Sequence, residues 1–363
     1  MQPSPAWQPS AFLDTMREAQ RAAMDNLRRA QANAFDLFGY GARENAFEVA
    51  ASGTHWRLRH YAGAASGGPL LLVPAPIKRP YIWDLDPSVS AVRFCLDQGF
   101  DVHLLEWIPP SDDDHAAGIE EYAEGAIAVC AAVVAERTGV TPVLLGHSLG
   151  GTLAAIACAL HPSAARGLVL LGAPLAFAPG SSRFRDLVVA CAAAGMPEDG
   201  VVAGSQLSQD CAFLSPAGFL WSRWMDGALC LGDPAAMDIH IRIERWALDE
   251  VALPGRLIHQ IVTWLYREDQ FHRGVLALSG GTIEARRGRA EARTRQAGRL
   301  ALPSVRRGDD AWRFHARRPG LAPNLYPPCS GGAGYGKTQL DVIWRSGWFN
   351  IGRGRSHDEQ RRG

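Results

Sequence analysis

The sequence predicts an α/β fold in which helices cover a mostly parallel sheet. Short apolar runs alternate with stretches of helical periodicity, and one run leads through a glycine-rich turn straight into a helix. Buried parallel strands consist of continuous apolar runs, and their alternation with helices indicates crossover connections between parallel neighbours. The predicted strands are 69–74, 99–105, 143–145 and 168–171, and the predicted helices are 88–98, 119–137 and 152–160.

The composition is typical of a globular protein, because 47% of the 363 residues are apolar and 20% are charged. No run approaches the roughly 18 apolar residues of a membrane span, and acidic residues interrupt the N-terminus where a secretory signal would be apolar. We therefore expect a cytoplasmic protein without a transmembrane segment. The seven cysteines are not closely paired in the sequence, which favours free thiols over disulfides or a zinc site. No cofactor or metal ion is predicted.

An amphipathic helix is predicted over residues 10–38, ahead of the sheet. Apolar side chains recur there at spacings of three and four. We expect this helix to pack on the main domain or on a partner helix, or to touch a hydrophobic surface. Its apolar positions are Phe12, Met16, Ala19, Ala23, Leu27, Ala30, Ala34 and Leu37.

A helical cap is predicted at about residues 176–275, where the rhythm of strands stops. This stretch is rich in tryptophan, and its position after the central strands favours a cap over the carboxyl edge of the sheet; the alternative is a helical layer of the core. The predicted units are an N-terminal helical segment (1–44), a core with its cap (45–280) and a tail (281–363). The tryptophans of the cap are Trp221, Trp224, Trp246 and Trp264.

Ser148 is the candidate nucleophile. Residues 146–151 read Gly-His-Ser-Leu-Gly-Gly, follow a predicted strand and precede a helix. This is the context of the G-x-S-x-G nucleophile elbow of α/β hydrolases. Gly146 and Gly150 leave room for a sharp turn, and the start of the helix can stabilise a developing oxyanion through its free N–H groups. The predicted fold is therefore an α/β-hydrolase fold.

Two backbone N–H groups are candidates for the oxyanion hole. One belongs to Leu149, directly after the nucleophile, and the other comes from the loop after the earlier strand. Pro76 in that loop has no N–H to donate, so Ile77 is the better candidate. His147 lies one position away from the serine, and we expect its side chain to pack rather than to act on the substrate.

A second segment resembles a known family. Residues 77–87 (IKRPYIWDLDP) are similar to the segment of polyhydroxyalkanoate synthases with the pattern I-N-[KR]-x-Y-x-x-D-L-x-P. Residues 90–107, residues 150–153 and Pro174 resemble later parts of the same family. The resemblance covers about residues 65–280. It implies an acyl-Ser148 intermediate formed from a hydroxyacyl-coenzyme A or a polyester, and binding to polyester granules or a partner subunit through the N-terminal helix.

Two features depart from this family. The synthases carry cysteine where this chain has Ser148, and serine serves ester hydrolysis as well as acyl transfer. The family's strand-borne Asp and later Gly-His are missing after residue 280. Asp309 or Asp310 with His357 is the one pairing in the order expected for a triad, but the flanking residues do not resemble strands.

Three functions therefore stay open. The first is acyl transfer, or ester or thioester hydrolysis, on hydroxyacyl-coenzyme A or polyhydroxyalkanoate-type substrates. The second is a general esterase, thioesterase or polyester depolymerase. The third is a catalytically inactive protein that binds granules or a partner, because a serine without a general base is a weak nucleophile.

The tail differs sharply from the rest of the chain. Residues 281–363 hold 16 Arg and one Lys against seven acids, a net charge of +10, although the whole chain is neutral. Apolar runs typical of strands no longer recur there, and Arg, Gly, Ala and Pro dominate the composition. Such a composition is expected of a GC-rich gene read out of frame. We hypothesise a frameshift near residue 281, with a genuine basic tail as the alternative. Nucleic-acid binding is not predicted. Residues 331–338 match a phosphate-binding loop, but no strand precedes them, which favours a chance match.

Overall fold

A six-stranded sheet forms the centre of the molecule in the computed structural model, which describes residues 9–63, 66–111, 116–192, 198–278, 281–283, 306–308 and 311–313. The strand order is β1-β2-β6-β3-β7-β8. The last four strands are parallel to one another, whereas β2 is antiparallel to both of its neighbours, β1 and β6. The mostly parallel sheet and the α/β-hydrolase fold are confirmed. The strands are β1 Glu48–Ser52, β2 Trp56–Tyr61, β3 Gly68–Val73, β6 Phe100–Trp107, β7 Val143–His147 and β8 Gly167–Leu171.

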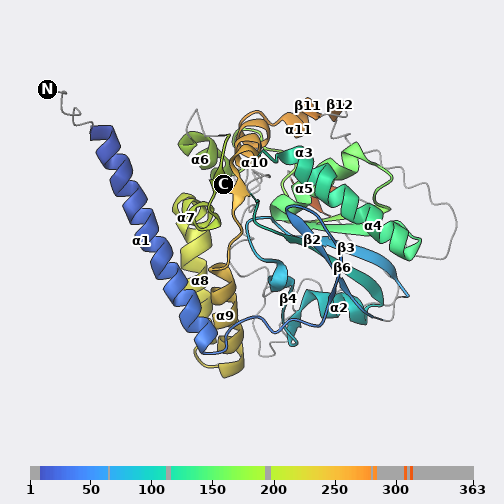
Figure 1. Cartoon of the computed structure of the whole chain (residues 1–363), viewed down its shortest axis with the longest axis horizontal. Coiled ribbons are helices and arrows are strands. Elements are labelled where there is room, and N and C mark those ends of the chain that lie inside the picture. The colour runs from blue at the N-terminus through green and yellow to red at the C-terminus, as the bar shows by residue number, and fades with distance from the viewer. Residues whose placement is uncertain are drawn as a thin grey trace, which may run out of the picture.

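Helices cover both faces of this sheet (Figure 1). Ile119–Tyr122 (α3), Ala123–Ala128 (a π-helical segment) and Val129–Thr138 (α4) run continuously and pack on one face together with Ser148–Leu160 (α5). Ala91–Asp97 (α2) packs on the other face, and Pro234–Ala247 (α9) contributes to the same buried cluster from beside the sheet (Figure 1). The sequence placed the start of α5 four residues too late and that of α2 three residues too early. Ser90 caps α2 by accepting a hydrogen bond from the Arg93 N–H, as N-cap serines do.

The central strand β3 explains why this sheet is stable. Leu71, Leu72 and Val73 are completely buried between the two helical layers. Burying one such side chain contributes about 1.5–3 kcal/mol. A continuous apolar run is therefore stable only at the centre of the sheet, which is where the chain places it.

Helices follow β8, as the sequence predicts, and Figure 1 shows α7, α8 and α9 beside the sheet. Two short strands, β9 Val201–Val202 and β10 Leu253–Pro254, pair with each other. That the segment caps the carboxyl edge stays a proposal. Its further helices are α6 Arg183–Cys191, α7 Gly204–Leu214, π-helical Ala217–Trp221, α8 Ser222–Cys230, α10 Gly255–Gln260, π-helical Ile261–Arg267 and α11 Gln270–Arg273.

The N-terminal helix α1 (Pro9–Leu37) packs on α9 through its polar face. Arg28 pairs with Glu250, and Asp36 lies 2.7 Å from the Arg245 guanidinium. The predicted apolar face points the other way: Leu27 is 63% exposed and Leu37 is 84% exposed. The helix therefore packs on the main domain, which is one of the outcomes expected from the sequence, and its apolar face is left exposed. Of the helices described, none combines the length and the apolar character needed to cross a membrane.

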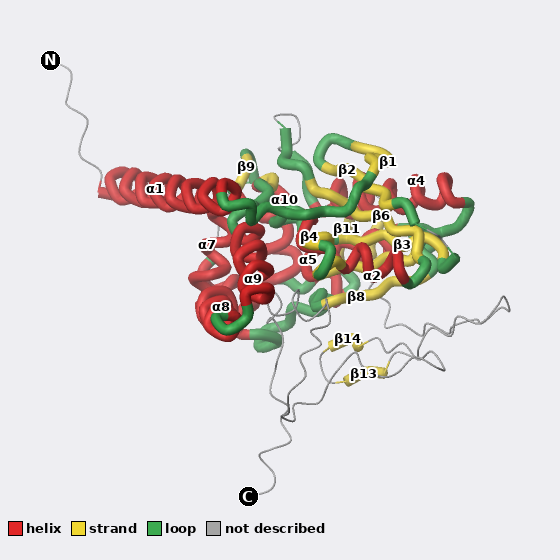
Figure 2. The backbone as a smooth tube through the Cα atoms, turned by 90° about the horizontal axis from the view of Figure 1, so that it is seen from below, coloured by secondary structure: helices red, strands yellow, loops and turns green. Residues whose placement is uncertain are grey.

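The described sheet ends at β8. All five residues of β8 are only partly buried. The later strands pair only with one another within the described residues: β11 Leu276–Leu278 with β12 Gly281–Ile283, and β13 Arg306–Gly308 with β14 Ala311–Arg313. Figure 2 shows β13 and β14 outside the six-stranded sheet. The second half of an α/β-hydrolase sheet is thus not among the described residues, and residues 331–338 also lie outside them.

Candidate active site

Ser148 occupies the sharp turn between β7 and α5. Its backbone is left-handed, with φ of 51°, and the only other non-glycine residue described with a positive φ is Asp269. Such a conformation costs on the order of 1–3 kcal/mol and persists where the surroundings enforce it. Strained residues of this kind concentrate at functional sites, and a strained serine between strand and helix is the geometry of a nucleophile elbow.

The flanking glycines show what enforces the turn. A Cβ on Gly150 would lie 2.2 Å from the Pro74 carbonyl oxygen, and one on Gly146 would lie 2.5 Å from the Gly151 Cα. A Cβ on Gly151 would lie 2.5 Å from the Ala173 side chain. Each contact is far inside van der Waals distance, so all three positions require glycine. The loop after β3, the first turn of α5 and the loop after β8 therefore meet around Ser148.

The oxyanion candidates lie in two of these segments. Leu149 is in the first turn of α5, where backbone N–H groups have no partner within the helix. Ile77 is in the loop after β3, whose Pro74 carbonyl lies directly against Gly150. The Ile77 carbonyl accepts a hydrogen bond from the Val251 N–H at 2.8 Å. Among the described residues, the Ile77 N–H makes no hydrogen bond.

A buried ion pair holds that loop in place. Lys78 Nζ lies 2.7 Å from Glu250 Oε1 and also donates to the Ala247 carbonyl, and Arg28 of α1 binds the same carboxylate. Burial lowers the pKa of Lys78 to about 8, and the Glu250 carboxylate partly offsets this effect. Both side chains are nearly inaccessible. This pair could not be predicted from the sequence, because its members are 172 residues apart.

His147 is a packing residue, in agreement with the sequence analysis. Its ring is buried and meets the edge of Trp83, with centroids 5.8 Å apart. Burial lowers its pKa to about 3. An imidazole that resists protonation so strongly, on the face of β7 away from the elbow glycines, is unsuited to take the serine proton at neutral pH.

No histidine among the described residues is hydrogen-bonded to the Ser148 hydroxyl. Asp310 and His357, the candidate triad partners, lie outside the described residues. His272 is half exposed, with its Nδ1 3.3 Å from Asp269 Oδ2. The same Asp269 carboxylate accepts a hydrogen bond from the Phe177 N–H at 2.7 Å, so it ties the loop after β8 to α11. The predicted partners of Ser148 therefore stay predictions.

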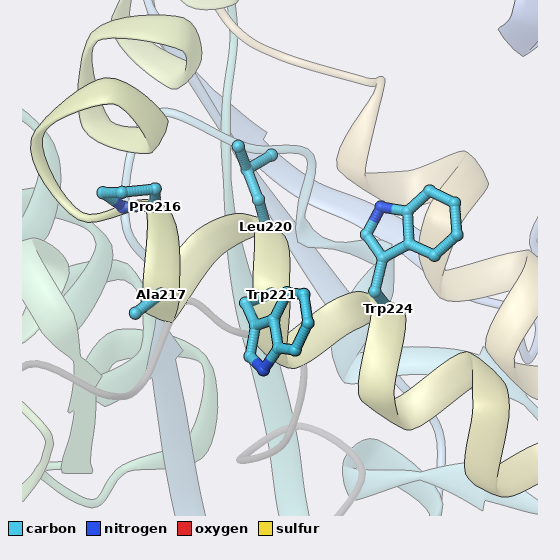
Figure 3. A pocket seen from close by; sticks show the side chains of 5 residues that line it. All are labelled: Pro216, Ala217, Leu220, Trp221 and Trp224. Carbon is cyan, nitrogen blue, oxygen red and sulfur yellow. The ribbon is translucent and has the colours of Figure 1, made fainter.

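Two surface hollows lie among the helices, and neither is lined by the residues of the elbow. One is lined by Gln20, Arg21, Met24 and Gln209 between α1 and α7. The other is lined by apolar side chains at the start of α8, and Figure 3 shows Leu220, Trp221 and Trp224 projecting from this turn. Trp224 is 80% exposed. Exposed apolar patches of this kind mark surfaces that contact other molecules.

The comparisons with known proteins agree with this fold. Residues 69–189 match the family model of the alpha/beta hydrolase fold. The poly(3-hydroxyalkanoate) polymerase subunit PhaC of Haloferax mediterranei is 29% identical over 238 residues, which are 64% of this chain and 48% of that protein. PhaC of Allochromatium vinosum is 28% identical over 221 residues, 60% of this chain and 61% of that protein. PhaC of Cupriavidus necator is 28% identical over 289 residues, 69% of this chain and 48% of that protein.

The chain has the α/β-hydrolase fold, with a strained serine turn between β7 and α5. Within that class its sequence is PhaC-like, as the resemblance of residues 77–87 suggested. The match spans about half to three fifths of the length of these curated relatives.

Proposed function

We propose that the chain transfers or hydrolyses the acyl group of a hydroxyacyl thioester or a polyester through a covalent acyl-Ser148 intermediate. The strained, glycine-flanked turn at Ser148 is the observation that carries this proposal. The sequence similarity to PhaC supports the hydroxyacyl-coenzyme A substrate class. General esterase, thioesterase or polyester depolymerase activity would use the same serine on other acyl donors.

The chemistry has two half-reactions. The Ser148 hydroxyl attacks the thioester carbonyl, a general base takes its proton, and the N–H groups of Leu149 and Ile77 stabilise the oxyanion. The carbon–sulfur bond then breaks, and the proton passes to the departing thiolate. Water or the hydroxyl of another hydroxyacyl group attacks the acyl-serine and releases a free acid or an extended ester. Each oxyanion donor contributes about 10²–10³-fold to the rate, and the base about 10²–10⁴-fold.

With 3-hydroxybutyryl-coenzyme A, we expect release of free coenzyme A and of 3-hydroxybutyric acid. We expect hydrolysis rather than polymer formation, because a serine nucleophile serves ester hydrolysis well. Water as the acyl acceptor also needs no long product channel. A thiol-reactive dye measures coenzyme A, and chromatography separates free acid from insoluble polymer. The Ser148→Ala variant is the control for a contaminating thioesterase. Accumulation of polymer would overturn the preference for hydrolysis, and no release above the control would count against the enzymatic proposal.

The exposed apolar face of α1 favours a second candidate function. We propose that this face binds the apolar surface of a cytoplasmic polyester granule, with or without catalysis at Ser148. The polar face of the helix already makes the contacts with α9, and the opposite face is left free for another surface. An amphipathic helix of this kind binds interfaces in proportion to its buried apolar area. A partner subunit is the alternative occupant.

Replacing Leu27 and Leu37 by glutamate should reduce binding to amorphous poly(3-hydroxybutyrate) particles at least about tenfold, because each buried leucine contributes about 1.5–3 kcal/mol. Co-sedimentation with particles measures this. The double variant Gln31→Glu and Asn33→Glu, on exposed positions of the same helix, adds equal charge and should bind normally. An equal loss of particle binding in both double variants would show that the added charge alone weakens binding. Wild-type protein that stays in solution would rule out granule binding.

A further inference from the structure

Two histidines and an aspartate come together at the far end of the sheet from Ser148. β2 and β6 are antiparallel, and His60 and His103 lie directly opposite each other in their register. Asp101 is two residues before His103 on β6, so it projects to the same face. The two imidazole rings stack with centroids 4.6 Å apart. One nitrogen or oxygen atom from each of the three residues lies within 4.8 Å of the others.

The Asp101 carboxylate lies beside the two stacked rings, with one oxygen near a nitrogen of each ring. Its Oδ1 is 2.8 Å from His60 Nε2, and its Oδ2 is 4.0 Å from His103 Nδ1. Tetrahedral ligands about 2.1 Å from a zinc ion are separated from one another by about 3.4 Å. The present separations lie on both sides of that value. Small side-chain rotations would therefore bring all three groups to coordination distance.

The hydrogen bonding of His60 is typical of a metal ligand. Its Nδ1 lies 3.0 Å from Glu48 Oε1 on the neighbouring strand β1. Both carboxylates only accept hydrogen bonds, so Nδ1 donates to Glu48 and Nε2 donates to Asp101 at 2.8 Å. A bound metal ion would replace the Nε2 proton and leave the Nδ1 bond to Glu48 in place. Histidine ligands commonly donate their second N–H to a carboxylate in this way, which fixes the tautomer and the ring orientation.

His103 provides an independent sign. Its side chain is 1% exposed, and neither ring nitrogen has a hydrogen-bond partner among the described residues. A buried polar group without a partner is costly and usually indicates a missing water, ion or ligand. The unpartnered ring lies beside a carboxylate and a second imidazole, which together are a donor set for a transition metal.

We propose that His60, Asp101 and His103 bind a divalent transition metal, with Zn²⁺ as the best fit. Two imidazole nitrogens and one carboxylate oxygen are ligands that zinc accepts readily, and water can occupy the fourth position. Calcium and magnesium prefer all-oxygen sites. Glu48 orients His60, and Arg137 pairs with Glu48 at 2.5 Å rather than with the ligands. The two carboxylates outweigh that single positive charge.

The site is structural rather than catalytic. Asp101 pairs with Pro69 at the start of β3, whereas Gly146 of the nucleophile turn pairs with Val73 at its end. Four residues at about 3.3 Å each separate the two levels by about 13 Å along the strands. A bound ion would join β2 to β6 and, through Glu48, to β1. The sequence alone could not indicate this site, because its residues are distributed over separate strands.

Titration of the chelator-treated full chain with Zn²⁺ or Co²⁺ tests the proposal. We expect one ion per chain, and weaker binding by about 100-fold or more in His103→Gln and Asp101→Asn, which each lose a ligand. Glu48→Gln should weaken binding about 10–100-fold, as loss of an orienting carboxylate does. The Co²⁺ spectrum should lack thiolate charge-transfer bands, which separates this site from the cysteines. His161→Gln, which removes an exposed histidine–carboxylate pair of 2.9 Å with Glu124, should bind normally.

Two controls keep the test decisive. Circular dichroism of each metal-free variant reports whether it folds. If His103→Gln does not fold, Glu48→Gln carries the test, because Glu48 is 60% exposed and can be changed without disturbing the core. Zinc should raise the thermal midpoint of the wild type but not that of Asp101→Asn. Absence of binding by the wild type, or equal affinity in all variants, would overturn the proposal.

Discussion

Ser148→Ala should abolish covalent labelling by a fluorophosphonate probe and reduce thioester turnover by on the order of 10⁴–10⁶-fold, as loss of a nucleophile does in serine hydrolases. The probe reacts with a serine hydroxyl that is both exposed to substrate and activated. The left-handed turn at Ser148 has the geometry of a nucleophile elbow, and the close contacts at the flanking glycines leave no room there for a larger side chain. Intact-protein mass spectrometry measures the labelling, and peptide mapping locates it.

The matched control is Ser163→Ala, which changes an exposed serine just beyond α5 and should label like the wild type. A chain shortened to end at residue 280 shows whether the general base lies before or after that residue. Labelling of that shorter chain would place the base within the described residues, where His272→Gln is the next variant to test. Labelling lost only on truncation would point to Asp310 and His357 or their neighbours. If Ser148→Ala still labels, the nucleophile is another residue, and if the wild type does not label, the binding function is favoured.

Restoring the reading frame after codon 280 should raise turnover by about 10²–10⁴-fold, the contribution of a general base. We hypothesise that residues from about 281 onward are a frameshift product. Another frame should then encode an apolar strand ending near an aspartate, followed by a glycine-rich strand ending at a histidine. The described sheet is consistent with this, because it stops at the partly exposed β8 and a native sheet rarely leaves an apolar edge open.

The nucleotide sequence decides the matter before any protein is made. If a suitable frame exists, the restored chain should also unfold at a higher temperature, since additional strands would cover β8. Both chains can be compared by thermal denaturation and by coenzyme A release. A genuine basic tail is the alternative explanation, and it holds if no other frame encodes the two strands.

The sequence predicted the parts of the fold that depend on local patterns. The runs that became β3, β7 and β8 are apolar and short, and the glycines around Ser148 identify the turn by themselves. The strands β1 and β2 were not predicted. The second of them reads Trp-Arg-Leu-Arg-His-Tyr, and its charged residues are stabilised by distant partners: Arg59 lies 2.7 Å from Glu106 of β6.

The features that could not be predicted depend on contacts between residues far apart in the chain. The face by which α1 packs could not be predicted, because amphipathic spacing indicates two faces without saying which one meets the protein. Here the polar face is chosen, because Arg28 reaches a carboxylate 222 residues away. Glu250 and the His60–Asp101–His103 cluster were missed for the same reason. Such groups can be recognised only when the strands and helices that carry them are placed side by side.

The left-handed backbone at Ser148 also constrains how this protein can evolve. A β-branched side chain is strongly disfavoured at a positive φ, so threonine is a poor replacement there. Cysteine has the same shape as serine, apart from one heavier atom. Serine can therefore be exchanged for cysteine at this position in evolution without a change in the backbone of the turn. If one descendant hydrolyses its substrate and another forms polymer, the residues that decide between the two reactions must lie elsewhere in the chain.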